Sequence, residues 1–323
     1  MLPNFSYVRT QSVEEAVQHL SDSGARLYAG GTDLLGCLRD GVFSADKVVS
    51  LGGIEQLSGI RQARDGGLRI GALTPIAELA SSPLLRERYP GLAQAAGDVA
   101  SPQLRNQGTL GGNLCQRPRC WYYRGEFHCL KKGGTKCYAV EGENRYHAIF
   151  GGGPCHIVHP SDTAPALIAL KASLTIEGRR GQRSLPAEEF FELPTFNLTG
   201  ENVLLRGDIL TEIVLPGETA GWKSSYRKVR ERGAWDFALS SLALAVRLDG
   251  KRVQEARAVL GGVAPIPWRS QAIEEAVTGK QIDSAIARQA AQAAVQGAEP
   301  LEQNGYKVAL VRGIVEESLL AIV

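Results

Sequence analysis

Short apolar patterns of two kinds alternate along the first hundred positions of the chain. Alternating apolar residues favour strands at FSYV, RLYA, KVVSL and LRIGAL. Helical spacing is expected at residues 13–20, from GGTDLL to Leu38, and at residues 76–80 and 91–99. Ser12 and Glu15 have the spacing of a capping box at the first of these helices. The alternation predicts a small α/β unit at the start of the chain.

The periodicity fails between residues 101 and 160, where glycine, proline, cysteine and charged residues dominate. So long a stretch without secondary structure is uncommon in a compact domain. We therefore expect this stretch to be organised by something other than an apolar core. Helical spacing returns at residues 162–171, and strands follow at SLTIEG and ILTEIVLP.

The last third of the chain has a different character. KSSYRKVR, FALSSLALAVRL and VQEARAVLGGV predict three strands joined by short turns, which form an antiparallel meander. Helical patterns close the chain at residues 270–278, 283–296 and 305–321. The whole pattern predicts an α+β fold that ends in a three-stranded antiparallel sheet with a helical bundle. It divides the chain into residues 1–55, 56–218 and 219–323.

The composition is that of an ordinary globular protein, long enough to bury a sizeable core. The 323 residues are 44% hydrophobic and 22% charged, and the formal net charge is +2. Acidic and basic residues are interspersed, which does not favour a nucleic-acid or membrane surface. No apolar run is long enough to span a bilayer, and MLPNFSYVRT lacks the pattern of a signal peptide. We expect a cytoplasmic protein, or periplasmic export of a folded complex on a partner's twin-arginine signal.

Five of the six cysteines lie close together, namely Cys115, Cys120, Cys129, Cys137 and Cys155. From Cys120 onward the successive gaps are nine, eight and eighteen residues, without the paired knuckles of a structural zinc site. A reducing compartment does not favour disulfides. An iron–sulfur cluster fits better, because four thiolates can wrap a cube from separated loop positions. Cys37 shares a helix with Leu34 and Leu38, so we expect it to be a buried apolar residue.

Basic residues accompany the cysteines, namely Arg117, Arg119, Arg124, Lys131, Lys132 and Lys136. A cube held by four thiolates is negatively charged, and nearby cations offset that charge. Any one of these residues alone is better explained as a solvated loop charge. His128 and His156 each neighbour a cysteine, but adjacent side chains usually point apart, so we do not expect them to be ligands. Cys115 ends the apolar run TLGGNLC and also fits a small buried apolar residue.

Two glycine-rich segments are candidates for binding an anion. AGGTDLL follows a strand and opens a helix, so its backbone N–H groups form a cradle suited to a pyrophosphate. A tight strand–helix turn without any ligand explains that segment equally well. The second segment, RNQGTLGGNL, is expected to form another glycine turn. The chain has neither a G-x-G-x-x-G fingerprint nor a Walker loop. A Rossmann domain is therefore disfavoured, whereas a long dinucleotide extended between two subdomains fits both segments.

Taken together, these segments resemble the FAD-binding medium subunit of the molybdenum hydroxylases, the family of xanthine dehydrogenase, carbon monoxide dehydrogenase and aldehyde oxidoreductases. The resemblance runs nearly from end to end. It is carried by FSYVRTQSVEEAV, AGGTDLL, QLRNQGTLGGNL, HPSDTAPALIAL, YRKVRERGAWDFAL, GGVAPIPWR and LVRGIVEESL. It implies a two-part FAD-binding domain of the vanillyl-alcohol-oxidase-like kind over 1–55 and 56–218. A C-terminal domain of the CO dehydrogenase flavoprotein type would follow over 219–323.

In most members of that family the segment after GGN passes quickly to the S-x-D motif, whereas about forty residues intervene here. This departure is similar to a subset that carries an additional [4Fe-4S] cluster, including the periplasmic aldehyde oxidoreductase type and 4-hydroxybenzoyl-CoA reductase. The resemblance implies an insertion at about 115–158 with Cys120, Cys129, Cys137 and Cys155 as ligands, leaving Cys115 spare. The shorter first gap between the cysteines and the GGVAPIPWR ending are more similar to the aldehyde oxidoreductase type than to the 4-hydroxybenzoyl-CoA reductase type.

The resemblance also implies a set of FAD-binding residues. The first turn would hold the pyrophosphate through Arg26, Leu27, Tyr28, Ala29, Gly30, Gly31, Thr32, Asp33 and Leu34. Thr109, Gly112 and Asn113 would form the second wall, and Asp162 would contact the adenosine side. Leu210 and Lys228 would lie near the flavin and its phosphates. Without the resemblance, the sequence favours a helix N-cap for Asp162 and an exposed strand lysine for Lys228 over a role in binding.

The chain would then be an electron-transfer subunit of an oxidoreductase, without catalytic residues of its own for substrate oxidation. The resemblance implies a heterotrimer, in which a large partner holds the molybdenum cofactor and a small partner holds two [2Fe-2S] clusters. Electrons from an aldehyde would pass through iron–sulfur centres to FAD and then to an acceptor such as NAD⁺, O₂, a quinone or a ferredoxin. A xanthine dehydrogenase or 4-hydroxybenzoyl-CoA reductase subunit is the near alternative. A stand-alone FAD oxidase and a zinc-binding module are the alternatives from other classes.

Overall fold

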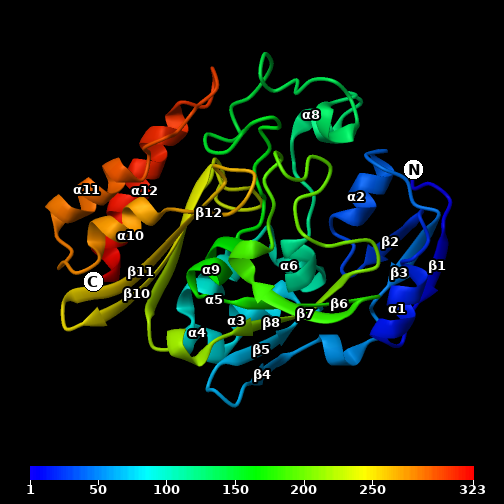
Figure 1. Cartoon of the computed structure of the whole chain (residues 1–323), viewed down its shortest axis with the longest axis horizontal. Helices are drawn as coiled ribbons and strands as arrows, with labels where there is room; N and C mark the ends of the chain where they lie inside the picture. Colours follow the sequence, from blue (N-terminus) through cyan, green and yellow to red (C-terminus); the bar gives the residue numbers. More distant parts are fainter.

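Three separate β-sheets organise the chain, and the computed structural model describes all of residues 1–323. The first sheet is parallel and consists of β1 (Ser6–Arg9), β3 (Lys47–Ser50) and β2 (Ala25–Tyr28), in that order. α1 (Val13–His19) and α2 (Leu34–Arg39) connect its strands (Figure 1). The Ser12 hydroxyl accepts a hydrogen bond from the Glu15 N–H at 3.1 Å, which confirms its capping role. The Glu15 carboxylate accepts from the Gln11 N–H, one residue earlier than a capping box predicts.

The second sheet is antiparallel and has five strands in the order β4–β5–β8–β6–β7. These are β4 (Ile60–Gln62), β5 (Leu68–Gly71), β8 (Ile209–Leu215), β6 (Ser173–Gly178) and β7 (Gly181–Pro186). The helices packed in the same core are α3 (Ile76–Ser81), α4 (Pro83–Arg88), α5 (Pro90–Gly97) and α9 (Thr163–Ala169). This core of 33 buried residues is the largest in the protein. The sequence pattern did not predict β4, β7 or α4, because these edge strands are mostly exposed and the helix is a short one.

The third sheet is antiparallel, and its four strands correct the expected three. They are β9 (Lys223–Val229), β10 (Ser240–Asp249), β11 (Arg252–Gly261) and β12 (Trp268–Arg269). β12 pairs with β11 through Val259 and Leu260, and its two residues are too few to produce an alternating pattern. The closing helices are confirmed as α10 (Gln271–Val277), α11 (Ser284–Ala293) and α12 (Tyr306–Ile322), and they cover one face of this sheet (Figure 1).

β10 of the third sheet is buried on both faces along most of its length. Leu242 and Leu244 of β10 belong to the core of 23 residues shared with α10–α12. Ala243 and Ala245, which alternate with them, belong to the 33-residue core on the other side. Because successive side chains of a strand point to opposite faces, one face of β10 packs on the C-terminal helices and the other face packs in the core of the middle of the molecule. The predicted boundaries after residues 55 and 218 stay predictions.

Residues 101–160 contain only short helices and loops, as the failed periodicity indicated. The helices are α6 (Pro102–Gln107), α7 (Leu110–Leu114) and α8 (Trp121–Arg124). TLGGNL, expected as a glycine turn, is therefore the start of a helix. We call residues 115–158 the cysteine segment; it lies between the N-terminal unit and α12 (Figure 1). Lys307 at the start of α12 binds the Tyr146 carbonyl at 2.9 Å, and the Asn304 amide binds the carbonyls of His147 and Ala148.

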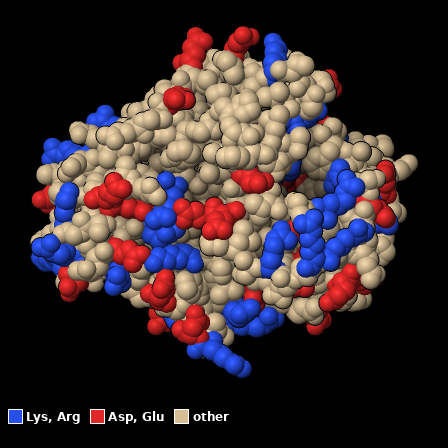
Figure 2. All heavy atoms as spheres, viewed as in Figure 1, with Lys and Arg blue, Asp and Glu red and all other residues tan.

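Charged side chains of both signs gather on the lower half of the face in Figure 2, and fewer lie across its upper part. None of the helices has both the length and the apolar character that a membrane crossing requires.

Candidate functional site

A cavity of about 720 Å³ lies between the parallel sheet, the five-stranded sheet and the cysteine segment. Its volume falls in the range of roughly 300–1,000 Å³ that small-molecule sites occupy. Twelve of the predicted cofactor residues line it, namely Leu27, Ala29, Gly30, Gly31, Thr32, Asp33, Leu34, Thr109, Gly112, Asn113, Asp162 and Leu210. The structure thus brings together residues from four distant parts of the chain, and their role in binding FAD stays a prediction.

Three predicted cofactor residues, Arg26, Tyr28 and Lys228, do not line the cavity. The Arg26 guanidinium lies over the Phe43 ring at 5.3 Å, and the Tyr28 ring meets Tyr7 edge-on with centroids 6.4 Å apart. Successive side chains along a strand point to opposite faces, so the neighbours of Leu27 point away from the cavity. Arg26 and Tyr28 therefore lie outside the lining of the cavity, and their assignment to the FAD site stays a prediction.

The first turn has free backbone donors in the lining of the cavity. No hydrogen bond within the chain engages the N–H groups of Gly30, Gly31, Thr32 or Asp33. A Cβ on Gly30 would overlap the carbonyl oxygen of Gln107, and Gly31 has φ +74°, so both positions require glycine. Consecutive unpaired N–H groups form a concavity suited to an anion.

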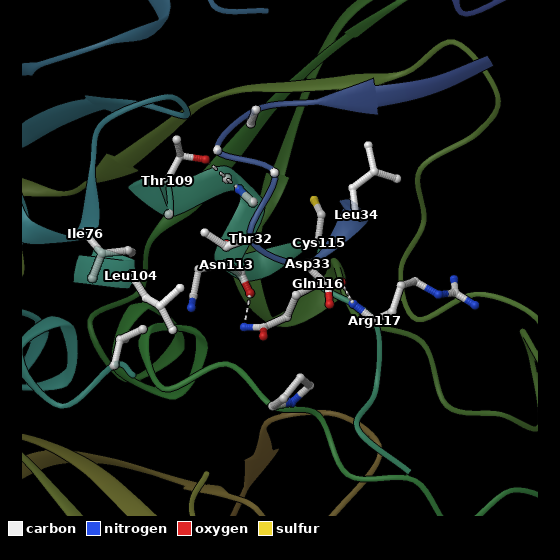
Figure 3. A pocket seen from close by; sticks show the side chains of 18 of the residues that line it. Thr32, Asp33, Leu34, Ile76, Leu104, Thr109, Asn113, Cys115, Gln116 and Arg117 are labelled. Atoms are coloured by element: carbon white, nitrogen blue, oxygen red, sulfur yellow. Dashed lines mark hydrogen bonds between the residues drawn. The ribbon is translucent and has the colours of Figure 1, made fainter. Parts of the chain in front are cut away.

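The second wall is formed by α7. Thr109 caps this helix, and its hydroxyl accepts a hydrogen bond from the Gly112 N–H at 3.1 Å. The side-chain oxygen of Asn113 accepts hydrogen bonds from the hydroxyls of Ser161 at 2.6 Å and Thr163 at 2.7 Å. Figure 3 shows Thr32, Asp33 and Asn113 around one space. The backbone N–H of Asn113 donates to the Thr109 carbonyl, whereas its side-chain amide nitrogen donates to no group in the chain and is available to a ligand.

Asp162 is held in a buried triad with Tyr226 and Lys228. The Tyr226 hydroxyl and the Lys228 ammonium each donate to one Asp162 carboxylate oxygen at 2.7 Å, and Lys228 also donates to the Asp98 carbonyl at 3.0 Å. Burial raises the pKa of Asp162, and Lys228 and Tyr226 oppose that shift. The interpretation of Lys228 as an exposed strand lysine is therefore wrong, because Lys228 is only 7% exposed. Asp162 occupies the N-cap position of α9, but its side chain does not cap the helix.

The connection between β9 and β10 supplies cavity residues that the sequence pattern did not predict. Arg232, Trp235, Asp236 and Phe237 line the cavity, and the Arg119 guanidinium lies over the Phe237 ring at 5.0 Å. A second cavity of about 430 Å³ shares Arg119 and Phe237 with the first. Its lining includes Cys120, so the two cavities extend from the first turn to the cysteine segment.

Three of the predicted ligands pack in one small apolar cluster, which contains Cys129 and has Cys120 and Cys137 against it, and Cys155 contacts Cys137. All six cysteines of the chain are free. A hydrogen bond from the Cys155 thiol lowers the pKa of Cys137 to about 5, and the same contact raises the pKa of Cys155. Burial raises the pKa of Cys120 to about 11, and Cys137 and Cys129 add to this shift. The structure contains no group of three or more His, Cys, Asp or Glu side chains arranged to hold a metal ion.

His147 is a neighbour of this group that the sequence did not reveal. Its Nε2 lies 3.3 Å from the Cys120 sulfur, although 27 positions separate the two residues. Cys37 is fully buried, as expected, and an Arg124 guanidinium nitrogen lies 2.8 Å from its sulfur. Cys115 lines the first cavity and packs against the largest core, which agrees with an apolar role.

His159 lies in the lining of the second cavity, and its burial predicts that the stability of the protein depends on pH. Burial lowers the pKa of His159 to about 3, whereas an unfolded histidine protonates at about 6.5. The contribution of the neutral His159 to the free energy of unfolding is fully present above the unfolded pKa. It is lost as the pH falls towards the folded pKa. Replacing His159 with glutamine should reduce the slope of unfolding free energy against pH between about 6 and 4 by up to ~1.4 kcal/mol per unit.

Urea denaturation at a series of pH values measures this slope. The exposed His128 offers a matched control, and His128→Gln should leave the slope unchanged. Equal slopes in the wild type and in His159→Gln would contradict a buried neutral His159.

Known proteins match both parts of the chain. Residues 3–218 match the FAD binding domain in molybdopterin dehydrogenase, and residues 224–322 match the CO dehydrogenase flavoprotein C-terminal domain. An aldehyde oxidoreductase FAD-binding subunit from Escherichia coli strain K12 is 35% identical over 319 residues, which are 95% of each chain. The carbon monoxide dehydrogenase medium chain of Hydrogenophaga pseudoflava is 30% identical over 326 residues, 99% of this chain and 97% of that one.

Solved structures agree with these sequence matches. Carbon monoxide dehydrogenase from Hydrogenophaga pseudoflava aligns with a TM-score of 0.79 at 30% identity, covering 100% of this chain and 98% of the other. Quinoline 2-oxidoreductase from Pseudomonas putida 86 aligns with the same TM-score and coverage at 24% identity, which supports the fold alone. The predicted fold class is confirmed apart from the fourth strand of the last sheet. This chain belongs to the family of FAD-binding medium subunits of the molybdenum hydroxylases.

Proposed function

We propose that this chain is the FAD- and [4Fe-4S]-binding subunit of a heterotrimeric, molybdenum-containing aldehyde oxidoreductase. Its family makes it a flavin-binding electron-transfer subunit of an oxidoreductase. The observation that carries the finer proposal is that three free cysteines, Cys120, Cys129 and Cys137, pack in one small cluster, with the free Cys155 in contact with Cys137. The segment that holds them also contributes to the lining of the cavity. Membership in a family of subunits does not favour a stand-alone FAD oxidase.

The residues around the first cavity fit an FAD molecule. The unpaired N–H groups from Gly30 to Asp33 suit a pyrophosphate, and the free Asn113 amide can bind a further polar group of the cofactor. The Asp33 carboxylate would repel an anion, but the Arg117 N–H and the guanidinium groups of Arg119 and Arg124 already bind it. FAD, when bound here, would supply the ability to accept and release one or two electrons.

The cysteine segment fits an iron–sulfur cluster better than a zinc ion. Cys120, Cys129, Cys137 and Cys155 would be the ligands. In a [4Fe-4S] cube each thiolate binds a different iron, so the sulfurs lie further apart than ligands that share one ion. The lack of a single-ion site among the His, Cys, Asp and Glu side chains therefore does not favour the zinc module.

Similarity to named relatives supports the substrate and the partners. The aldehyde oxidoreductase subunit matches 95% of this chain at 35% identity. A xanthine dehydrogenase FAD-binding subunit from Escherichia coli O157:H7 matches 84% of it at 29% identity. We propose a large molybdenum-cofactor partner and a small [2Fe-2S] partner by analogy with these multi-subunit enzymes. The compartment, cytoplasmic or periplasmic by export on a partner, stays a prediction.

Cofactor analysis of the anaerobically purified chain and complex tests this proposal. We expect about four irons and four acid-labile sulfides per FAD in the isolated chain, since a cube holds that number of each. Addition of an aldehyde to the complex should bleach the flavin absorbance, whereas xanthine and carbon monoxide should not. A chain that binds FAD without iron, or that contains zinc instead, would contradict the cluster. Bleaching of the flavin absorbance by xanthine but not by an aldehyde would contradict the proposed aldehyde substrate.

A further inference from the structure

Two carboxylates, one in the lining of the first cavity and one next in sequence to a lining residue, hold basic side chains from the cysteine segment. The first is Asp33, in the glycine turn. Its carboxylate accepts a hydrogen bond from the Arg117 N–H at 2.7 Å, and it lies 3.0 Å from the Arg119 and 2.7 Å from the Arg124 guanidinium. Figure 3 shows the bond between Asp33 and the Arg117 backbone. The start of the cysteine segment is thereby fixed to the turn that we assign to the pyrophosphate.

The second carboxylate, Glu201, belongs to a loop that the sequence did not mark. It is 3% exposed, and its two oxygens lie 2.8 Å from an Arg117 guanidinium nitrogen and 2.7 Å from the Lys131 ammonium. Arg117 also donates to the Thr199 carbonyl at 2.8 Å. Lys131 donates to the carbonyls of Leu198 at 3.0 Å and Gly200 at 2.8 Å. Residues 198–201 therefore form a receptor for these two cations.

This receptor loop is itself part of the cavity wall. Asn202, the residue after Glu201, lines the cavity. The Asn197 side chain braces the loop, since its amide donates to the Glu192 carboxylate at 2.8 Å and its carbonyl accepts from the Gly200 N–H at 2.7 Å. On the other side, Lys131 lies between Cys129 and Cys137 in the sequence. The contact between Glu201 and Lys131 therefore joins the cavity wall directly to the predicted cluster loop.

The energetics of this contact depend on the charge of Glu201. The Lys131 side chain is only 1% exposed, and Glu201 is its only acidic partner. Loss of one partner of a buried ion pair is strongly destabilising, because the other charge is left without compensation. Any change that loosens the cysteine segment thus also loosens residues 198–202, and the reverse holds because linkage is reciprocal.

We propose that Glu201 is a positioning residue that couples the cysteine segment to the FAD cavity, so that flavin binding and cluster loading strengthen each other. This inference rests on the proposed function. It predicts that the affinity for FAD depends on whether the cluster is present, although Glu201 itself does not line the cavity.

Flavin titration of the full chain, with the cluster reconstituted and with iron removed, tests the coupling. In the wild type, iron removal should weaken FAD binding by about 5- to 150-fold, the usual range of coupling between two sites. In Glu201→Gln the two affinities should become nearly equal, and less iron should be retained. Glu201→Asp keeps the charge and should retain part of the ratio between the FAD affinities with and without the cluster. This variant still tests the coupling if Glu201→Gln folds poorly.

Glu188→Gln is the matched control, because Glu188 pairs with Arg257 and Arg269 outside both cavities. It should keep the wild-type ratio of affinities. A wild-type chain that binds iron, yet binds FAD equally well without it, would overturn the coupling and leave the proposed function intact. An unchanged ratio in Glu201→Gln would overturn the role of Glu201. A chain that binds no iron under reconstitution would overturn the proposed cluster and the coupling together.

Discussion

Replacement of Cys137 by serine is expected to remove most of the iron and to unfold the cysteine segment while the rest of the protein stays folded. The segment depends on bound metal because it contributes only four of the six buried residues in its small core, against 33 and 23 in the two large cores. Metal binding in such a segment supplies folding free energy directly. The same result is expected for Cys129→Ser, because Cys129 is both a predicted ligand and a member of the small core.

Iron and sulfide analysis measures the loss of the cluster, and hydrogen exchange over residues 115–158 measures the unfolding. Cys37→Ser is the matched control, since Cys37 is buried in the same small core but is not a predicted ligand. A serine at position 37 can still accept a hydrogen bond from Arg124, whose guanidinium now lies 2.8 Å from the Cys37 sulfur. Its iron content should equal that of the wild type. Equal iron in all three variants would refute the assignment of the ligands.

The parts of the site that the sequence predicted well are those formed by neighbouring residues. AGGTDLL predicted an anion cradle, and the structure contains a turn with four unpaired N–H groups that line a cavity. The need for glycine at positions 30 and 31 follows from a close approach and a positive φ, which the glycine pair signalled. The closing helices were predicted for the same reason, because the spacing of their apolar residues is a local property.

The parts that could not be predicted depend on contacts between distant segments. Glu201 and His147 have no local motif, and each acquires its role only when the fold places it beside Arg117 and Lys131, or beside Cys120. β12 has two residues and exists because β11 provides its partner. TLGGNL was expected as a turn on account of its glycines, but the Thr109 cap and burial of Leu110 and Leu114 stabilise a helix there.

Strand alternation explains why only part of the predicted run of FAD-binding residues lines the cavity. The resemblance assigned every residue from Arg26 to Leu34 to one ligand, yet Arg26 and Tyr28 do not line the cavity. A continuous run of contacts is possible in a turn but not along β2, where side chains alternate between faces. Which of the two faces meets the ligand is decided by packing with the rest of the protein.

Lys228→Met is expected to lower the free energy of unfolding of the flavin-free chain by about 3–5 kcal/mol, the usual cost of breaking a buried ion pair. The lysine side chain is 1% exposed and lies 2.7 Å from the Asp162 carboxylate, so its removal leaves a buried charge with only the Tyr226 hydroxyl as a partner. Without Lys228 the pKa of Asp162, already raised by burial, should rise further. A raised folded pKa costs stability above the unfolded value, so the defect should shrink as the pH falls to about 4.

Urea denaturation at pH 7 and near pH 4 measures the defect, and two further variants identify its cause. Arg227→Met, at the next position of the same strand, removes an exposed partner of Glu317 at 3.1 Å and should cost at most about 1 kcal/mol. The double variant Lys228→Met with Asp162→Asn should recover much of the loss, because the neutral amide no longer needs a cation and can still bind Tyr226. Equal losses in Lys228→Met and Arg227→Met, or no recovery in the double variant, would show that the triad does not hold Asp162 in the way its contacts indicate.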